Sequence, residues 1–123
     1  MEASGCPPLN PKVSVIVPTF NQGHFLREAI NSVLAQTLSE WELIIVDNFA
    51  IDSTSEIVSS FADSRIRYKR FRNHGVIGRS RNFGVSLARA PFIAFLDSDD
   101  TWAPEKLESC IGVLNNESAD VVC

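Results

Sequence analysis

An apolar run that stops abruptly at a group of acids constrains this chain more than any other feature. Residues 92–96 are apolar without a break, and Asp97, Asp99 and Asp100 follow almost at once. Such a run predicts a strand that is buried on both faces of a sheet. Open α/β sheets bind their ligands at the carboxyl ends of the strands, which is where these acids lie.

The spacing of Asp97 and Asp99 indicates a cation site. Residues two apart in an extended backbone project to the same side, so the two carboxylates would repel each other unless a cation lay between them. Mg²⁺ or Mn²⁺ carrying a phosphate suits such a pair of oxygen ligands. The alternative is a helix-capping cluster, because Asp favours helix N-termini. One acid or Thr101 would be enough for capping, so the metal site is the favoured interpretation.

Segments of strand and helix character alternate along the chain. Strands are predicted at residues 13–17, 43–46, 65–71 and 92–96, with a fifth beginning at 120–123, and helices at 25–34, 53–61, 78–88 and 104–114. This alternation predicts a doubly wound, mostly parallel α/β sheet with helices on both faces. Residues 1–11 are expected to form an irregular lead-in. Because the chain stops inside an apolar segment, we expect the fold to be truncated.

Composition narrows the class of protein. The 123 residues are 45% hydrophobic and 21% charged, as in one soluble globular domain. A net charge of −4 argues against a nucleic-acid partner, because a protein that binds nucleic acid normally carries a basic face. The basic cluster at 65–72 is interpreted as a solvated strand face, with an anionic-ligand rim as the alternative.

Cellular location is inferred from what the sequence lacks. No apolar run reaches the roughly 20 residues of a membrane-spanning helix, so no transmembrane segment is predicted in this chain. Three irregularly spaced cysteines favour reduced thiols in a cytosolic compartment. We therefore expect a cytoplasmic protein, one able to work at the inner face of the membrane through a part not present here.

Three loops that follow predicted strands should meet at one edge of the sheet: residues 18–23, 47–52 and 97–101. Asp47 has two interpretations of equal weight, namely bonding the following turn or recognising a nucleobase or ribose. Arg81 lies in a segment bracketed by glycines. It is either a solvated helix residue or a group that approaches an anionic donor.

Five blocks, in this order, resemble the family 2 glycosyltransferases: residues 13–21, 32–37, 42–48, Arg81-Asn82-x-Gly84 and 92–100. The resemblance covers residues 12–123. It implies the nucleotide-diphospho-sugar transferase fold, called GT-A, with 12–123 as its nucleotide-sugar-binding part. It also implies metal-dependent transfer of a sugar from a nucleotide-diphospho-sugar, expected to be a UDP-sugar, to an acceptor hydroxyl with inversion.

The resemblance assigns roles to the matched residues. The residues implied to hold the nucleotide-sugar are Pro18, Thr19, Phe20, Asp47, Arg81 and Asp97. Among them, Pro18, Thr19 and Phe20 would line the base pocket and Asp47 would bond the base. Asp97 and Asp99 match the D-x-D motif of the family, which holds the ribose and a divalent metal, Mn²⁺ or Mg²⁺. Asp99 is expected to be the principal metal ligand.

The chain departs from the family at two points. Phe49 stands where a small polar residue is usual, so it could crowd the base pocket. The catalytic base of the family lies well beyond the D-x-D motif, so it is expected beyond Cys123. The implied acceptor is a carbohydrate or a lipid-linked molecule, in the synthesis of a cell-envelope polysaccharide.

Three other functions match parts of the sequence. A haloacid-dehalogenase-type phosphatase would use Asp97 as nucleophile and Asp99 as acid/base, but that motif normally opens its domain. A phosphoacceptor receiver module needs acids after the first strand, where this chain has Thr19 and Asn21. A catalytically incomplete nucleotide-binding fragment is compatible with the family resemblance and stays open.

Overall fold

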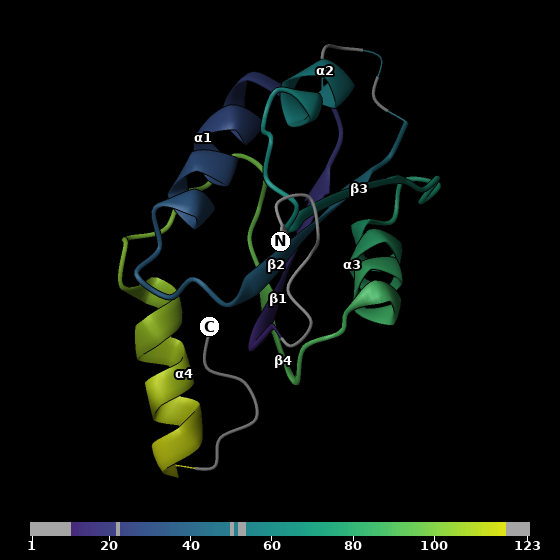
Figure 1. The fold of residues 1–123 in the computed structure, drawn as a ribbon. Helices are drawn as coiled ribbons and strands as arrows, with labels where there is room; N and C mark the ends of the chain where they lie inside the picture. The colour runs from purple at the N-terminus through teal and green to yellow at the C-terminus, as the bar shows by residue number, and fades with distance from the viewer. Residues whose placement is uncertain (1–10, 22, 50, 52–53, 118–123) are drawn as a thin grey trace.

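The computed structural model describes residues 11–21, 23–49, 51 and 54–117. Strands and helices alternate strictly within this part of the chain (Figure 1). In order they are β1 (Val13–Thr19), α1 (Gly23–Leu34), β2 (Trp41–Asp47), α2 (Thr54–Ser59), β3 (Ile66–Arg70), α3 (Ile77–Leu87), β4 (Phe92–Phe95) and α4 (Lys106–Glu117). The alternation predicted from the sequence is confirmed.

The strands form one sheet in the order β3-β2-β1-β4, and every pair is parallel. β1 pairs with β2 over seven residues, from Val13 opposite Trp41 to Thr19 opposite Asp47. Parallel strands need crossover connections, which the helices supply. All four strands therefore end at the same edge of the sheet.

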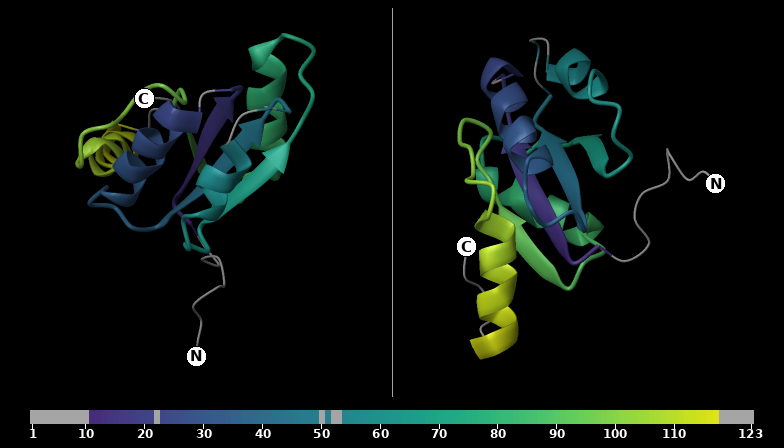
Figure 2. Two further views of the ribbon diagram at one scale, coloured as in Figure 1. Left: turned by 90° about the horizontal axis from the view of Figure 1, so that it is seen from above. Right: turned by 60° about the vertical axis from the view of Figure 1, so that its left-hand side comes forward.

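Helices cover both faces of the sheet (Figure 2). On one side α1, α2 and α4 enclose the larger core, which includes Val15, Leu26, Ile30, Leu43, Val58 and Leu107. On the other side α3 covers a smaller cluster of Ile16, Ile44 and Val46, against which Phe83 and Leu87 pack. Because successive strand residues face opposite ways, the central strands β1 and β2 are buried at every position. The doubly wound α/β class is thus confirmed.

β1 continues two residues beyond the predicted end and includes Pro18. Leu96 N donates to Ile16 O, so the even-numbered residues of β1 direct their backbone groups toward β4. Pairing with β4 ends at Ile16, before Pro18 would have to donate a bond. Proline is tolerated there because no ladder bond depends on its missing N–H.

Some predicted burial is wrong. β4 is an outer strand of the described sheet, and Phe95 is 42% exposed, so the prediction of burial on both faces fails there. Phe25 in α1 and Val85 in α3 are also exposed, although both are apolar residues of predicted helices. In α3 the buried positions are instead Ser80 and Gly84. The predicted strand at 120–123 and Ser53, the first residue of the helix predicted at 53–61, lie outside the described residues.

One expectation about side-chain chemistry is wrong, and a second holds only in part. Cys110 on α4 is disulfide-bonded, where reduced thiols were expected. The basic cluster is a solvated face in part, because Lys69, Arg70 and Arg72 are exposed. Arg65, however, pairs with Asp63 at 2.7 Å, and its guanidinium lies 3.8 Å from the Trp41 ring centre. Arg67 reaches the buried Glu42 at 3.1 Å.

Glu42 is fully buried at the end of the sheet where the strands begin. Its carboxylate accepts hydrogen bonds from Ser14 Oγ at 2.6 Å, Arg89 N at 2.7 Å and the Arg67 and Arg89 guanidiniums at about 3.1 Å. Burial is the largest single influence on the pKa of Glu42 and raises it, but the hydrogen bonds from Ser14, Arg89 and Arg67 together outweigh burial. The pKa of Glu42 is therefore lowered.

Replacing Glu42 with Ala should cost about 3 kcal/mol in the free energy of unfolding, because it removes the shared partner of a buried network.

The lowered pKa of Glu42 also sets how the stabilisation by this carboxylate depends on pH. The stabilisation is complete above the unfolded-state pKa of a glutamate, about 4.3, and is lost as the pH falls through the folded-state pKa. Urea denaturation between pH 7 and pH 3 measures both effects. Glu40→Ala is the matched control, since Glu40 is half exposed and lies 3.9 Å from Lys12. An equal loss in both variants would contradict the role of Glu42.

Gly84 allows α3 to approach β1 closely. A Cβ at this position would lie 2.5 Å from Ile16 Cγ2, whereas a Cβ at Gly78 would meet nothing within 4 Å. Overpacking of this kind costs about 1–3 kcal/mol, while Gly to Ala in an open helical position gains up to about 1 kcal/mol. We therefore expect Gly84→Ala to lower, and Gly78→Ala to raise or keep, the urea midpoint. Equal midpoints for the two variants would refute the packing role of Gly84.

Candidate functional site

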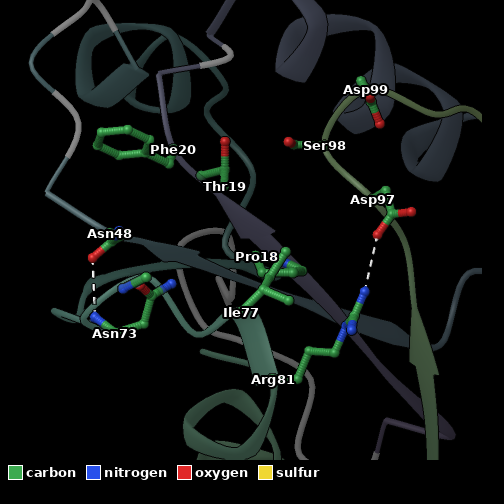
Figure 3. Close-up of a pocket in the computed structure, with 11 residues that line it drawn as sticks. Pro18, Thr19, Phe20, Asn48, Asn73, Ile77, Arg81, Asp97, Ser98 and Asp99 are labelled. Carbon is green, nitrogen blue, oxygen red and sulfur yellow. Dashed lines mark hydrogen bonds and ion pairs between the residues drawn. The ribbon is translucent and has the colours of Figure 1, made fainter. Parts of the chain in front are cut away.

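A pocket of about 500 Å³ opens at the edge where the strands end (Figure 3). Its walls come from the end of β1, the residue after β2, the loop between β3 and α3, the first turns of α3 and the turn after β4. The lining residues are Pro18, Thr19, Phe20, Asn48, Asn73, Gly75, Ile77, Arg81, Asp97, Ser98 and Asp99. The predicted convergence of separate loops on one crevice is confirmed.

Six of the seven residues named from the sequence line this pocket, and Asp47 is the exception. Asp47 is 1% exposed at the end of β2. Its carboxylate accepts a hydrogen bond from the Tyr68 hydroxyl and lies 4.0 Å from Arg70 Nε. Two residues further along the chain, Phe49 has a positive φ of 54°, and the guanidiniums of Arg70 and Arg72 lie 4.6 Å and 4.5 Å from its ring centre. The predicted base contact of Asp47 is thus covered by its own neighbours in this structure.

Thr19 carries a buried hydroxyl on the pocket wall. The residue is 5% exposed, and its Oγ1 has no hydrogen-bond partner among the described residues. A buried polar atom left without a partner costs about 1–3 kcal/mol, so such atoms are uncommon unless a ligand or water serves them. Thr19 is therefore a place where a polar ligand would be favoured.

The acids after β4 do not continue in extended backbone. Asp100 N donates to Asp97 O at 3.0 Å, which closes a turn over residues 97–100. The prediction that extended geometry brings Asp97 and Asp99 to one side is wrong, because the turn decides their directions. Ser98 is 2% exposed, whereas the acids on either side of it are exposed and border the pocket. Their carboxylates still share one cavity wall.

Asp97 and Asp99 differ in their surroundings. Arg81 Nη2 lies 3.3 Å from Asp97 Oδ1, and Figure 3 shows the guanidinium reaching from α3 to this carboxylate. Asp99 has no ion-pair partner within the part of the chain that the structure describes. One acid of the pair is thus balanced by an internal cation and the other is not.

The two carboxylates fit a divalent cation of the Mg²⁺ type. Such ions are commonly held by one or two carboxylates, with phosphate oxygens and water completing the shell. The described residues contain no group of three or more His, Cys, Asp or Glu side chains arranged for a metal. The donor set therefore suits a cation that arrives with a phosphate ligand.

Asn73 is a site residue that sequence reasoning missed. It is 7% exposed, its Nδ2 donates to Ser80 Oγ at 2.9 Å, and its Oδ1 accepts from Gly75 N at 2.9 Å. Its own N–H donates to Asn48 Oδ1 at 3.0 Å. These bonds join the loop before α3 to the end of β2. The signal in the sequence was Asn73-x-Gly75, a turn pattern in which His74 and Gly75 take φ angles of 55° and 80°.

Asn48, Ile77 and Ser98 also line the pocket, although the sequence predicted no role for them there. Ile77 lies one helical turn before Arg81, so the two share a face of α3. Nothing about Ile77 in the sequence distinguishes it from an ordinary core residue. Only its place in the first turn of α3 brings it to the pocket.

The sequence matches the family model described as glycosyl transferase family 2 over residues 14–123. This chain belongs to that family. The predicted resemblance is therefore confirmed, and the phosphatase alternative is not favoured.

Two curated glycosyltransferases are similar in sequence. UDP-Glc:α-D-GlcNAc-diphosphoundecaprenol β-1,3-glucosyltransferase WfgD of Escherichia coli is 40% identical over 102 residues, which are 83% of this chain and 40% of that protein. The putative teichuronic acid biosynthesis glycosyltransferase TuaG of Bacillus subtilis is 37% identical over 100 residues, 80% of this chain and 40% of that protein. The chain thus spans about two fifths of these relatives.

A solved structure confirms the GT-A type of fold. TarS residues 1–349 of S. aureus has a TM-score of 0.83 and 31% identity, over 89% of this chain and 34% of that one. TarS residues 1–349 in complex with UDP-GlcNAc gives the same score and identity, over 32% of that chain. As for membrane segments, none of the helices in the described residues is long and apolar enough to span a bilayer.

Replacing Asn73 with Ala should destabilise the family 2 domain by about 1–3 kcal/mol, because Ser80 and the Gly75 N–H lose a buried partner. Urea denaturation measures this loss, and Asn31→Ala on the exposed side of α1 is the control. We expect the control to change the free energy of unfolding by less than about 0.5 kcal/mol. If both variants unfold like the unmodified chain, Asn73 does not order the pocket loop.

Proposed function

We propose that this chain forms the donor-binding part of a glycosyltransferase that uses a UDP-sugar and a divalent metal. The observation that carries the proposal is one pocket at the carboxyl edge of a parallel sheet, in which Asp97 and Asp99 face the Thr19 hydroxyl. This hydroxyl has no hydrogen-bond partner in the described part of the chain. Ligands of open α/β sheets bind at this edge. The pocket of about 500 Å³ also lies in the size range of small-molecule sites.

The two sides of the pocket differ in chemistry, which supports an assignment of the donor's parts. Phe20 presents a half-exposed aromatic ring beside Asn48, a wall suited to the flat face of a nucleobase. The turn with Asp97 and Asp99 lies on the other side and suits the diphosphate with its metal. In this proposal, Asp47 bonds the base only after the contacts that cover it have shifted.

The metal, when bound, would neutralise charge that develops on the leaving diphosphate. Asp99 is proposed as its principal protein ligand and Asp97 as the second. The remaining work falls to residues of this chain, with Pro18, Thr19 and Phe20 holding the nucleoside. Arg81 is proposed to lie on the diphosphate side of the pocket.

The reaction itself is a substitution at the anomeric carbon of the sugar. The acceptor hydroxyl oxygen forms the new bond, the bond to the diphosphate oxygen breaks, and UDP leaves with the electron pair. The hydroxyl proton passes to a general base, which must lie within hydrogen-bond reach. Inversion at the carbon follows from such a single displacement and is part of the proposal. None of the described residues is assigned as the base.

The relatives guide the choice of donor and acceptor. WfgD carries UDP-Glc and a diphosphoundecaprenol acceptor in its name, and TarS was crystallised with UDP and with UDP-GlcNAc. A UDP-sugar donor and a lipid-linked acceptor of cell-envelope polysaccharide synthesis, used at the inner face of the membrane, are therefore the proposal for this chain. A nucleotide-binding fragment without transfer activity is the second candidate, because the chain spans only part of these relatives.

Replacing Asp99 with Asn should abolish the metal-dependent part of UDP binding and leave the fold intact, since the change removes charge and little volume. Calorimetry of the chain with UDP, in Mn²⁺ and in chelator, measures this part. Asp100→Asn is the control, because Asp100 is an exposed neighbour that does not line the pocket. Equal UDP affinity with and without chelator in the unmodified chain would refute the metal's role.

A transfer assay with a radiolabelled UDP-sugar and a lipid-linked acceptor separates the two candidates. UDP binding with transfer supports the enzyme, and UDP binding without transfer by this chain supports the fragment. Absence of UDP binding in either metal condition would refute both.

A further inference from the structure

Arg81 has two potential partners in the site, and it cannot serve both fully. In this structure its Nη2 lies 3.3 Å from Asp97 Oδ1, while both side chains border the pocket. A guanidinium has no acceptor and stays charged, so it competes with a metal ion for a carboxylate oxygen. The same guanidinium matches a phosphate equally well.

We propose that Arg81 is an exchangeable counterion: it occupies Asp97 before the cation arrives and transfers to the donor's diphosphate when the cation takes its place. This inference rests on the proposed function, since it needs a diphosphate ligand. As a consequence, metal and nucleotide each favour binding of the other. The cation releases Arg81 from Asp97, and the diphosphate binds the released guanidinium.

The position of Arg81 is suited to such an exchange. Its side chain is 37% exposed and that of Asp97 is 59% exposed, so the ion pair faces the pocket opening and not the core. Exposed pairs are weak, worth about one- to fivefold in an equilibrium constant, and can be broken by a ligand. By contrast, Arg89 and Arg67 form ion pairs with the fully buried Glu42 carboxylate at the opposite end of the sheet.

Nearby contacts leave the Arg81 side chain able to move. The Phe95 ring centre is 5.9 Å from its guanidinium carbon, at the outer limit of a cation–π contact. Its guanidinium donates a hydrogen bond to the exposed Asp97 carboxylate, which solvent or a ligand can replace. Ile77 and Arg81 share a face of α3 and both line the pocket, so the helix holds the base of the Arg81 side chain at the pocket wall.

Replacing Arg81 with Gln should change two affinities in opposite directions. Mn²⁺ alone should bind the full chain about two- to fivefold more tightly, because Asp97 no longer has an internal cation. UDP in the presence of Mn²⁺ should bind about tenfold more weakly, because a charge-assisted hydrogen bond to phosphate is lost. Electron paramagnetic resonance of free Mn²⁺ gives the first affinity, and calorimetry with UDP the second.

Two controls test whether these changes come from the pairing of Arg81 with Asp97. Arg79→Gln removes the same charge from an exposed position of α3 that does not line the pocket, so it should leave both affinities nearly unchanged. In an Asp97→Asn background, Arg81→Gln should no longer tighten Mn²⁺ binding, because the carboxylate it releases is gone. A thermal melt by circular dichroism checks that each variant is folded.

The exchange is overturned if Arg81→Gln weakens or does not change Mn²⁺ binding, or if Arg79→Gln tightens it equally. Failure of the proposed function gives a different result, since the unmodified chain then binds no UDP, or binds UDP equally with Mn²⁺ and with chelator, and the exchange falls with it. If the unmodified chain binds both and only the opposite effects are missing, the exchange alone is wrong.

Discussion

The seven-residue parallel pairing of β1 with β2 is the constraint on which the site depends. It puts Thr19 opposite Asp47, and the backbone of β1 also carries β4 on its other side. The strand ends are thereby fixed at one edge, with the loop before α3 joined to them by Asn73. A slip of one residue in this pairing would turn every side chain of a strand to the opposite face, with the burial of both cores lost.

The two ends of the sheet differ in how well their charged and polar side chains are paired. Where the strands begin, the Glu42 carboxylate has no exposure and is satisfied by Ser14, Arg67 and Arg89. Where they end, Asp97 has one weak ion pair, and Thr19 Oγ1 has no partner among the described residues. A satisfied buried network holds one end rigid, while unsatisfied polar groups at the other end favour a ligand. The division between scaffold and site follows from that difference.

Much of the site could be predicted because parallel topology converts sequence order into spatial convergence. Pro18, Thr19, Phe20, Asp97 and Asp99 each lie at or just after the end of a strand, so placing the strands places them. Asn73 escaped prediction because its role consists of bonds to Gly75, Ser80 and Asn48, of which only the first is local. Phe95 was misjudged because an apolar run does not reveal whether its strand lies inside a sheet or at its side.

The sequence alone determined the alternation of strands and helices, the parallel sheet and the family, because periodicity and contiguous motifs are local properties. Only the tertiary structure decided which charges meet. Glu42 joins Arg89 across 47 positions, and Arg81 joins Asp97 across 16. It also decided that Asp47 is covered and that Asp97 and Asp99 lie on a turn. Such contacts depend on register and helix rotation, and no short stretch of sequence specifies these, because the energies that fix them come from packing between distant segments.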